Sequence, residues 1–293
     1  MANIAFLGTG LLGAAFAEAA AKRGDAVTVW NRSPDKARVL AASGIAVAAT
    51  PAEAVRGAAR VHLVLKDDAV VDVVIAAAQG GLAADAILID HSTTLPVLTA
   101  ARAQRLAASG VQYLHCPVFM TPQAARNAQG SMLVAGPLAA FERVRAELAA
   151  MTGRLEYQGE RSDLAAANKL FGNAMILSLS GAMADVLTLA RASGVDGEAA
   201  IGLLGLLDLN AMVATRGINM ARGKFTPSFE LAMARKDIAL MLETAAGRPL
   251  AVLPGVAARM DQLLAGGHGA DDATVLAIDA VAPRSGGHVH GAA

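Results

Sequence analysis

The 293-residue sequence has a single cysteine, Cys116, and few aromatic residues, which make up 3% of the chain. One cysteine excludes an internal disulfide framework and fits a reducing compartment, so we expect a cytoplasmic protein in which this thiol is buried and inert. Scarce aromatic residues and abundant alanine disfavour an all-β sandwich and favour close-packed helices.

The chain also lacks an excess of either charge. Lys plus Arg and Asp plus Glu number 25 each, so the formal net charge is 0. No global field draws the chain to nucleic acid or to an anionic membrane, and any anion site must be local. Uncharged runs, such as residues 170–184, stay below the ~18 residues that a membrane span needs. We therefore expect a small-molecule substrate as the partner, with no nucleic acid and no membrane.

The N-terminus follows the order strand, glycine turn, helix, strand. An apolar run at residues 3–7 is followed by an alanine-rich stretch and a second apolar run, and the turn between them reads Gly8-Thr9-Gly10-Leu11-Leu12-Gly13. A G-x-G-x-x-G turn in this setting predicts a dinucleotide-binding site. We expect Gly8 to permit the tight turn, Gly10 to let the backbone approach a pyrophosphate, and Gly13 to let the helix pack on the strand. A tight turn without a ligand is the alternative.

The cofactor preference is indicated by Asn31, Arg32 and Ser33. An NAD-binding fold places Asp or Glu here, and a carboxylate would repel a 2′-phosphate. Asn31 and Ser33 can instead donate hydrogen bonds, and Arg32 can pair with the phosphate and stack on adenine. We therefore expect NADP(H) rather than NAD(H). The alternative, which is compatible with the first, is that Ser33 caps the next helix and Pro34 occupies its first position.

Strands and helices alternate through the first half of the chain. The sequence predicts strands at 3–7, 27–30, 45–48, 61–65, 86–90, 111–118 and 132–135, with helices between them. This alternation predicts an α/β fold with a doubly wound parallel sheet and right-handed crossovers. Substrate and nicotinamide then lie at the carboxyl ends of the strands, in the loops that start at Lys66, His91 and Phe119.

From Asp163 onward the sequence predicts helices alone, at 163–192, 197–207, 210–221, 227–246, 249–264 and 270–280. We place the domain boundary accordingly: a dinucleotide-binding domain over 1–162 and an all-helical substrate and dimerisation domain over 163–293. The first helix is apolar nearly all round, which predicts burial on several sides and a homodimer. His288 and His290, in the glycine-rich tail, lack partners for a metal site, and we expect no metal.

Two lysines stand out in the helical half. Lys169 and Asn173 lie four residues apart, hence on one helix face, inside apolar sequence. Such a lysine can protonate a carbonyl oxygen as hydride arrives at its carbon, and Asn173 can hold the substrate oxygen or orient the amine. From the residues alone, a lysine that reaches from an apolar helix to solvent is the commoner case. Lys236 follows a helix start predicted at Thr226 and Pro227, and we expect it to point away from Asp237.

The chain resembles the β-hydroxyacid dehydrogenase family, which includes 3-hydroxyisobutyrate dehydrogenases and semialdehyde reductases. The similarity covers nearly the whole chain in order: the glycine turn with Asn31-Arg32-Ser33, Asp90-His91-Ser92-Thr93, Pro117-Val118, Lys169 with Asn173, and Lys236-Asp237. The resemblance implies a Rossmann domain, a helical domain and a dimer interleaved through the long helix. It implies that Lys169 is the catalytic acid/base and that Asn173 holds the substrate. It further implies cofactor contacts from Leu65, Lys66, Thr93 and Lys236, and substrate contacts from Ser92, Phe119, Met120 and Thr121.

One segment departs from the family pattern. The family follows Pro-Val with Ser-Gly-Gly, whose hydroxyl and amides grip a substrate carboxylate, whereas this chain continues with Phe119-Met120-Thr121-Pro122. Phe119 and Met120 offer no strong donor, and proline removes an amide, so carboxylate recognition is in question. Either Thr121, Gln123 and Arg126 substitute, or the substrate is larger and less polar.

Together these features predict an NADP(H)-dependent oxidoreductase that transfers hydride between NADPH and a small aldehyde or ketone, with Lys169 as acid/base. The first alternative is an imine reductase, a related architecture with a more apolar pocket that generally lacks this lysine. The second alternative is a non-catalytic NADPH-binding protein.

Overall fold

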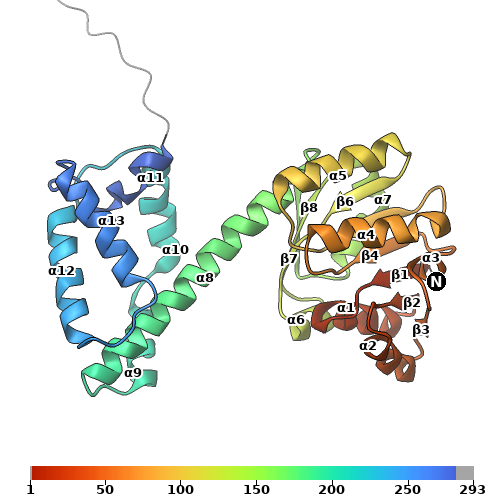
Figure 1. Ribbon diagram of the computed structural model, residues 1–293, viewed down its shortest axis with the longest axis horizontal. Coiled ribbons are helices and arrows are strands. Elements are labelled where there is room, and N and C mark those ends of the chain that lie inside the picture. The colour runs from red at the N-terminus through yellow and green to blue at the C-terminus, as the bar shows by residue number, and fades with distance from the viewer. Residues whose placement is uncertain (1, 282–293) are drawn as a thin grey trace, which may run out of the picture. The chain divides into compact units, whose positions relative to one another are not determined.

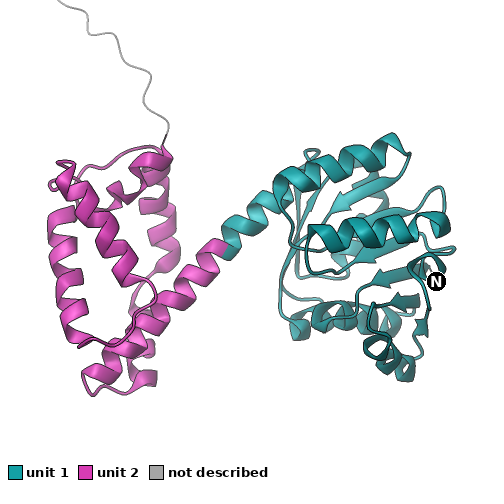
Figure 2. Ribbon diagram, viewed as in Figure 1, with its two compact units in different colours: residues 1–173 teal, residues 174–293 magenta. Residues whose placement is uncertain are grey.

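The computed structural model describes residues 2–281. The chain forms two compact units, residues 1–173 and 174–293, which are coloured separately in Figure 2. The division falls inside helix α8 (Asp163–Ala192), which contributes to both units. The domain boundary at 162/163 stays a prediction. His288 and His290 lie outside the described residues, and residues 2–281 contain no group of three side chains placed to hold a metal ion.

The first unit is built on a nine-stranded sheet in the order β3-β2-β1-β4-β5-β6-β8-β7, with β9 paired to β8. The strands are β1 (Asn3–Leu7), β2 (Ala26–Trp30), β3 (Ala46–Val47), β4 (Arg60–Leu63), β5 (Ile87–Asp90), β6 (Gln112–His115), β7 (Val118–Phe119), β8 (Ser131–Ala135) and β9 (Arg154–Gly159). All neighbours from β3 to β6 are parallel, and helices cover both faces (Figure 1). The predicted doubly wound Rossmann fold is confirmed.

The helices of the first unit follow the predicted alternation. They are α1 (Leu11–Lys22), α2 (Pro34–Arg38), α3 (Pro51–Ala54), α4 (Asp68–Ala78), α5 (Pro96–Ala108), α6 (Pro122–Arg126) and α7 (Leu138–Ala149), with 3₁₀ turns at Val39–Ser43 and Gln79–Gly81. The apolar core lies on both sides of the sheet, because buried parallel strands pack against helices on either face. Cys116 is fully buried there, which confirms the predicted burial, and burial raises the pKa of its thiol.

The end of the sheet differs from the prediction of a wholly parallel sheet. β8 runs antiparallel to both β6 and β7, and β9, which was not predicted, pairs in parallel with β8. The single strand predicted at 111–118 is broken into β6 and β7 at Cys116-Pro117. Proline has no N–H for a sheet ladder, which explains the break. β9 escaped prediction because its charged residues, Arg154 and Glu156, are those of an exposed edge strand.

The second unit is helical, as predicted. Beyond α8 it contains α9 (Gly197–Leu203), α10 (Leu209–Met212), α11 (Ile218–Ala221), α12 (Leu231–Thr244) and α13 (Leu253–Ala265), with 3₁₀ segments at Leu204–Leu206 and Ala273–Ala280 and a π-helical turn at Val213–Gly217. Its buried core is formed by α12, α13 and the last 3₁₀ segment.

Two helix starts were predicted too early. α12 begins at Leu231 rather than at Pro227, because the carboxylate of Asp272 accepts the N–H groups of Ser228 and Phe229, at 2.8 and 3.1 Å, and holds this segment out of the helix. α13 begins at Leu253 rather than at Pro249, where the carboxylate of Asp185 accepts the N–H groups of Ala251 and Val252. Long-range hydrogen bonds overrode the local capping pattern in both cases.

Helix α8 is long and apolar enough to cross a membrane, judged by length and composition, although one such helix is weak evidence. In this chain several of its large apolar side chains are exposed; Leu177, for example, is 70% exposed. The expected burial against a second subunit, and the expected absence of a membrane, stay predictions.

Candidate active site

The carboxyl ends of four parallel strands lie in register at one edge of the sheet. Leu7 pairs with Leu63, Leu63 with Asp90, and Asp90 with His115. The segments that follow these residues therefore emerge side by side, which brings the glycine turn and the loops after β4, β5 and β6 to the same edge.

The glycine turn has the geometry that the sequence predicted. Gly8 adopts φ of +103°, and a Cβ there would lie 2.3 Å from the Val64 carbonyl oxygen. A Cβ on Gly13 would lie 2.0 Å from the Gly8 oxygen, so only glycine lets the helix approach the turn this closely. Nothing lies within 4 Å of the position of a Gly10 Cβ, which leaves the backbone open on that side.

The turn and the start of α1 fit a phosphate-bearing cofactor. α1 has no acidic residue in its first turn, so its free N–H groups, beginning at Leu11 and Leu12, face no competing carboxylate. The hydroxyl of Thr9 is buried without a hydrogen-bond partner in the described structure, as expected of a group that awaits a ligand. A nicotinamide dinucleotide bound here would lie against chain atoms that provide donors and no negative charge.

The three residues after β2 divide into two roles. Asn31 Oδ1 accepts a hydrogen bond from Thr9 N at 3.0 Å, and Asn31 Nδ2 donates to the Ser33 carbonyl at 3.0 Å. Asn31 thus ties the glycine turn to the loop after β2. Ser33 occupies the N-cap position of α2 but its side chain makes no capping hydrogen bond. Arg32 is exposed and has no ion pair with any described residue, so Arg32 and Ser33 keep their donors for a ligand.

Lys169 is held by three neighbours within the first unit. Its Nζ donates to the Val118 carbonyl at 2.7 Å and to Asn173 Oδ1 at 3.0 Å, and it lies 4.1 Å from the centre of the Phe119 ring. Burial lowers the pKa of this ammonium. A lysine that simply reaches from an apolar helix to bulk solvent is therefore excluded.

The other residues predicted to contact cofactor or substrate in the loops after β4 and β5 differ in their exposure to solvent. Ser92 is buried, and its Oγ accepts the backbone N–H of Leu65 at 3.0 Å, so it joins the loops after β4 and β5. Thr93 beside it is exposed. Lys66 has an 87% exposed side chain with a loose 3.8 Å ion pair to Asp67. The structure brings all four to the same edge, and their contacts with ligands stay predictions.

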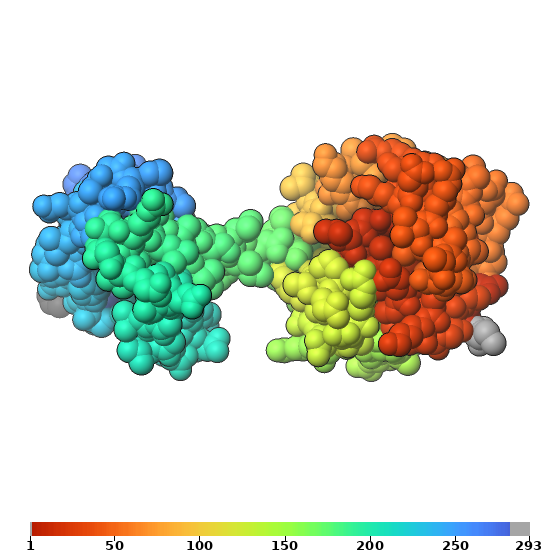
Figure 3. Space-filling view, turned by 90° about the horizontal axis from the view of Figure 1, so that it is seen from below, coloured from red at the N-terminus to blue at the C-terminus, as the bar shows by residue number. Residues whose placement is uncertain are grey.

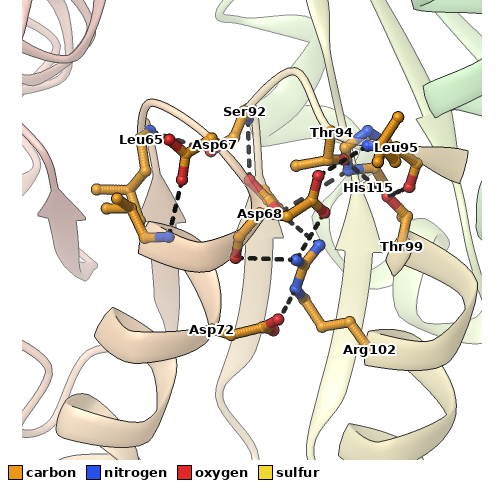
Figure 4. Close-up of polar contacts among 12 residues, drawn as sticks. Leu65, Asp67, Asp68, Asp72, Ser92, Thr94, Leu95, Thr99, Arg102 and His115 are labelled. Carbon is orange, nitrogen blue, oxygen red and sulfur yellow. Dashed lines mark hydrogen bonds and ion pairs between the residues drawn. The ribbon is translucent and has the colours of Figure 1, made fainter. Parts of the chain in front are cut away.

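Sequence reasoning missed a buried arginine that connects these loops. Arg102 on α5 is 1% exposed, donates from Nη2 to Asp68 at 2.8 Å and from Nε to Asp72 at 2.7 Å (Figure 4). Asp68 also accepts the backbone N–H of Leu95 at 2.9 Å. Burial would lower the pKa of Arg102, but its hydrogen bonds to Asp72 and Asp68 outweigh burial and raise it. Two carboxylates four residues apart on the helix after β4 were the signal that could have found this site.

A buried polar chain lies beneath the same loops. Asp90 accepts the Tyr113 hydroxyl at 2.8 Å and the Ser92 N–H at 2.9 Å. His91 Nδ1 lies 2.8 Å from the Cys116 carbonyl, and its Nε2 lies 3.0 Å from His62 Nδ1. Burial lowers the pKa of His91 to about 4, so the ring is neutral near pH 7 and links neighbouring strands.

The segment after β7 offers little to an anionic substrate. Thr121 Oγ1 accepts the Ala124 N–H at 3.1 Å and caps α6. Arg126 forms a 2.7 Å ion pair with Glu18 of α1, and the two segments form adjoining patches of the surface in Figure 3. Met120 is half-buried against the core of the first unit. Among the residues proposed to substitute for Ser-Gly-Gly, Arg126 is thus paired elsewhere, and Thr121 keeps only its O–H as a donor.

Lys236 lies on α12 in the second unit. Its Nζ is 3.0 Å from Asp237 Oδ1, so the prediction that the two side chains point apart was wrong. The long lysine side chain bends back to its neighbour, because flexible exposed side chains can pair outside the usual helical spacing. Its contact with the cofactor stays a prediction.

A glycine turn open to a phosphate and a half-buried lysine at the same sheet edge define a nicotinamide-dependent oxidoreductase. Residues 3–159 match the family model described as the NAD binding domain of 6-phosphogluconate dehydrogenase, and residues 164–278 match the NAD-binding domain of NADP-dependent 3-hydroxyisobutyrate dehydrogenase. The chain belongs to the 3-hydroxyisobutyrate dehydrogenase, or β-hydroxyacid dehydrogenase, family.

Individual relatives agree with this assignment. The chain is 30% identical to the uncharacterized oxidoreductase YfjR of Bacillus subtilis, over 86% of this chain and 89% of that one. It is 29% identical to glyoxylate/succinic semialdehyde reductase 1 of Arabidopsis thaliana, over 85% and 89%. Among solved structures, an imine reductase of Streptomyces aurantiacus superposes with a TM-score of 0.86 at 25% identity, covering 95% of this chain and 99% of that one.

Proposed function

We propose that the protein is an NADPH-dependent reductase of small aldehydes or ketones, reversible as an alcohol dehydrogenase, with Lys169 as the proton donor. The observation that carries the proposal is the partly buried Lys169 ammonium, which is anchored through Val118 and Asn173 beyond the carboxyl end of β6. NADPH, when bound, supplies the hydride that adds to the carbonyl carbon and is oxidised to NADP⁺. The C=O electron pair that is released takes a proton from Lys169.

Lys169 is suited to this step by its environment. Two of its three N–H groups are used by Val118 and Asn173, which leaves one for the oxygen of the substrate. A lowered pKa brings the amine closer to the pH at which it can both donate and recover a proton. Asn173, one helical turn away, keeps the amine oriented.

The preference for NADPH rests on Arg32 and Ser33. Both keep unused donors at the end of β2, and no carboxylate stands at this position. We further propose that the enzyme acts in the cytoplasm as a homodimer joined through α8, whose exposed apolar side chains suit a subunit interface.

Replacement of Lys169 by alanine tests the proposal. With aldehydes as substrates, we expect kcat to fall by roughly 10²–10⁴-fold, because the proton donor is lost. NADPH binding, followed by nicotinamide fluorescence, should persist. Lys22→Ala, which removes an exposed lysine from the end of α1, serves as the matched control and should retain activity. Full activity of Lys169→Ala would refute the proposed role.

A second candidate function is imine reduction. Phe119 places apolar surface beside Lys169, and the Streptomyces aurantiacus relative is an imine reductase. A panel of aldehydes, ketones and cyclic imines with NADPH separates the two. Turnover of imines alone would favour this candidate over the carbonyl reductase.

A further inference from the structure

The side chain of Phe119, on β7, packs against α8. Its backbone pairs with Ser131 of β8, and its ring lies against Gly172 on the helix that carries Lys169. A Cβ on Gly172 would lie 2.3 Å from Phe119 Cζ, so a larger residue there would require the ring to move. Glycine is unfavourable inside a helix, and its presence here is explained by the room that it gives to the phenyl group.

The ring also acts on the charge of Lys169. The ammonium lies 4.1 Å from the ring centre, within the range of a cation–π interaction. The electron-rich ring face stabilises the cation, which opposes the effect of burial. The same face is unfavourable for a carboxylate.

No cation of the segment after β7 is free to bind a substrate carboxylate in place of the ring. Arg126 is paired with Glu18 at 2.7 Å, and the donors left in this segment, such as the Thr121 O–H, are neutral. Lys169 has one N–H left, which the reacting oxygen needs. A carboxylate brought beside Phe119 would lose part of its hydration without gaining a cation as its partner.

We propose that Phe119 is a specificity-determining residue that makes the enzyme select carbonyl substrates without a carboxylate group. The proposal rests on the reductase function stated above and names its substrate class. The phenyl ring supplies an apolar wall on the substrate side of Lys169 and at the same time keeps the ammonium charged.

Substrate selection is tested with a pair of aldehydes that differ in charge alone, succinic semialdehyde and its methyl ester. With NADPH, we expect the native enzyme to prefer the ester in kcat/KM by at least about tenfold, because the anion would be desolvated without a cationic partner. In Phe119→Ser the ring is replaced by a hydroxyl donor, and the preference should shrink at least about tenfold. A native preference for the carboxylate, or an unchanged ratio in Phe119→Ser, would overturn the proposal.

The conservative variant Phe119→Leu separates the apolar wall from the ring electrons. It should keep the preference for the ester while losing the cation–π interaction. In unit 1 the groups that face Lys169 are Asn173, the Val118 carbonyl and the Phe119 ring, and burial is the cause of its lowered pKa, so no charged side chain masks the effect. In the pH–rate profile, reduction falls with rising pH as Lys169 loses its proton. The apparent pKa of this fall should be lower in Phe119→Leu than in the native enzyme by roughly 0.5–1 unit. An unchanged apparent pKa would refute the electrostatic part of the proposal.

Failure of this inference is distinguishable from failure of the proposed function. If Lys169→Ala abolishes reduction while Phe119→Ser leaves selection unchanged, the reductase function stands and the role of Phe119 is wrong. If the native enzyme reduces neither aldehyde nor any member of the wider panel, the reductase function itself is wrong, and the inference is lost with it. NADPH fluorescence of both Phe119 variants confirms that the cofactor domain is folded.

Discussion

Arg32 is the residue on which the cofactor preference depends. It is exposed after β2 with no ion pair in residues 2–281, whereas the nearby Arg38 is already bonded to Asp35 at 2.7 Å. A guanidinium without a partner at the ribose end of a dinucleotide site is suited to a 2′-phosphate. Asn31 is bonded to Thr9 and Ser33, and its predicted contact with the phosphate stays a prediction.

Replacing Arg32 by alanine tests this cofactor preference. Loss of a charge-assisted phosphate contact should weaken NADPH binding by about 2–3 kcal/mol, a factor near one hundred, and leave NADH binding little changed. Titration of both cofactors by fluorescence gives the measurement. Arg38→Ala is the matched control and should change neither affinity by more than about threefold. Equal losses for the two cofactors in Arg32→Ala would contradict a phosphate contact.

Among the secondary-structure elements, helices α4 and α5 are joined to each other by one buried cation, Arg102. Arg102 binds Asp68 and Asp72 of α4, and Asp68 holds the backbone at Leu95, where α5 begins. Since the loops before both helices bear predicted cofactor contacts, we expect Arg102 to position the nicotinamide end of the site.

Replacing Arg102 by methionine should therefore affect both stability and cofactor use. We expect the free energy of unfolding to fall by about 3–5 kcal/mol, because carboxylates lose a buried partner. The KM for NADPH should rise more than kcat falls. Arg105→Met is the matched control, since Arg105 binds the same Asp72 at 3.0 Å but is 60% exposed, and it should cost at most about 1 kcal/mol. Thermal unfolding and steady-state kinetics measure the two effects. If Arg102→Met is destabilised but its KM for NADPH is unchanged, Arg102 has a structural role alone.

For the whole molecule, the main expectation is the homodimer. α8 presents Phe171, Met175 and Leu177 with exposures of 68%, 58% and 70%. A run of this kind along one helix is far more apolar than an ordinary solvated face, so we expect a subunit interface here.

Light scattering should give twice the mass of the chain, and Leu177→Asp should dissociate the dimer by weakening association by about 2–4 kcal/mol. Val73→Asp, on α4 and similarly exposed at 69%, is the control and should leave the mass unchanged. A native protein that scatters as a monomer at micromolar concentration would contradict the dimer.

The sequence alone determined the α/β half, the helical half and the glycine turn, because each depends on local patterns. Buried parallel strands need continuous apolar runs, and Gly8 and Gly13 meet steric limits set within their own βαβ unit. The pairing of Lys169 with Asn173 followed from helical spacing in the same way.

Tertiary structure decided the features that join distant segments. Three features depend on groups far apart in sequence: the antiparallel end of the sheet, the hydrogen bonds to Asp272 that delay the start of α12, and the ion pairs of the buried Arg102. The Phe119 ring contacts Lys169 across 50 residues of chain. It also packs on Gly172, because the fold brings β7 against α8. Such contacts carry no local pattern, since burial and charge pairing are settled when the elements pack together.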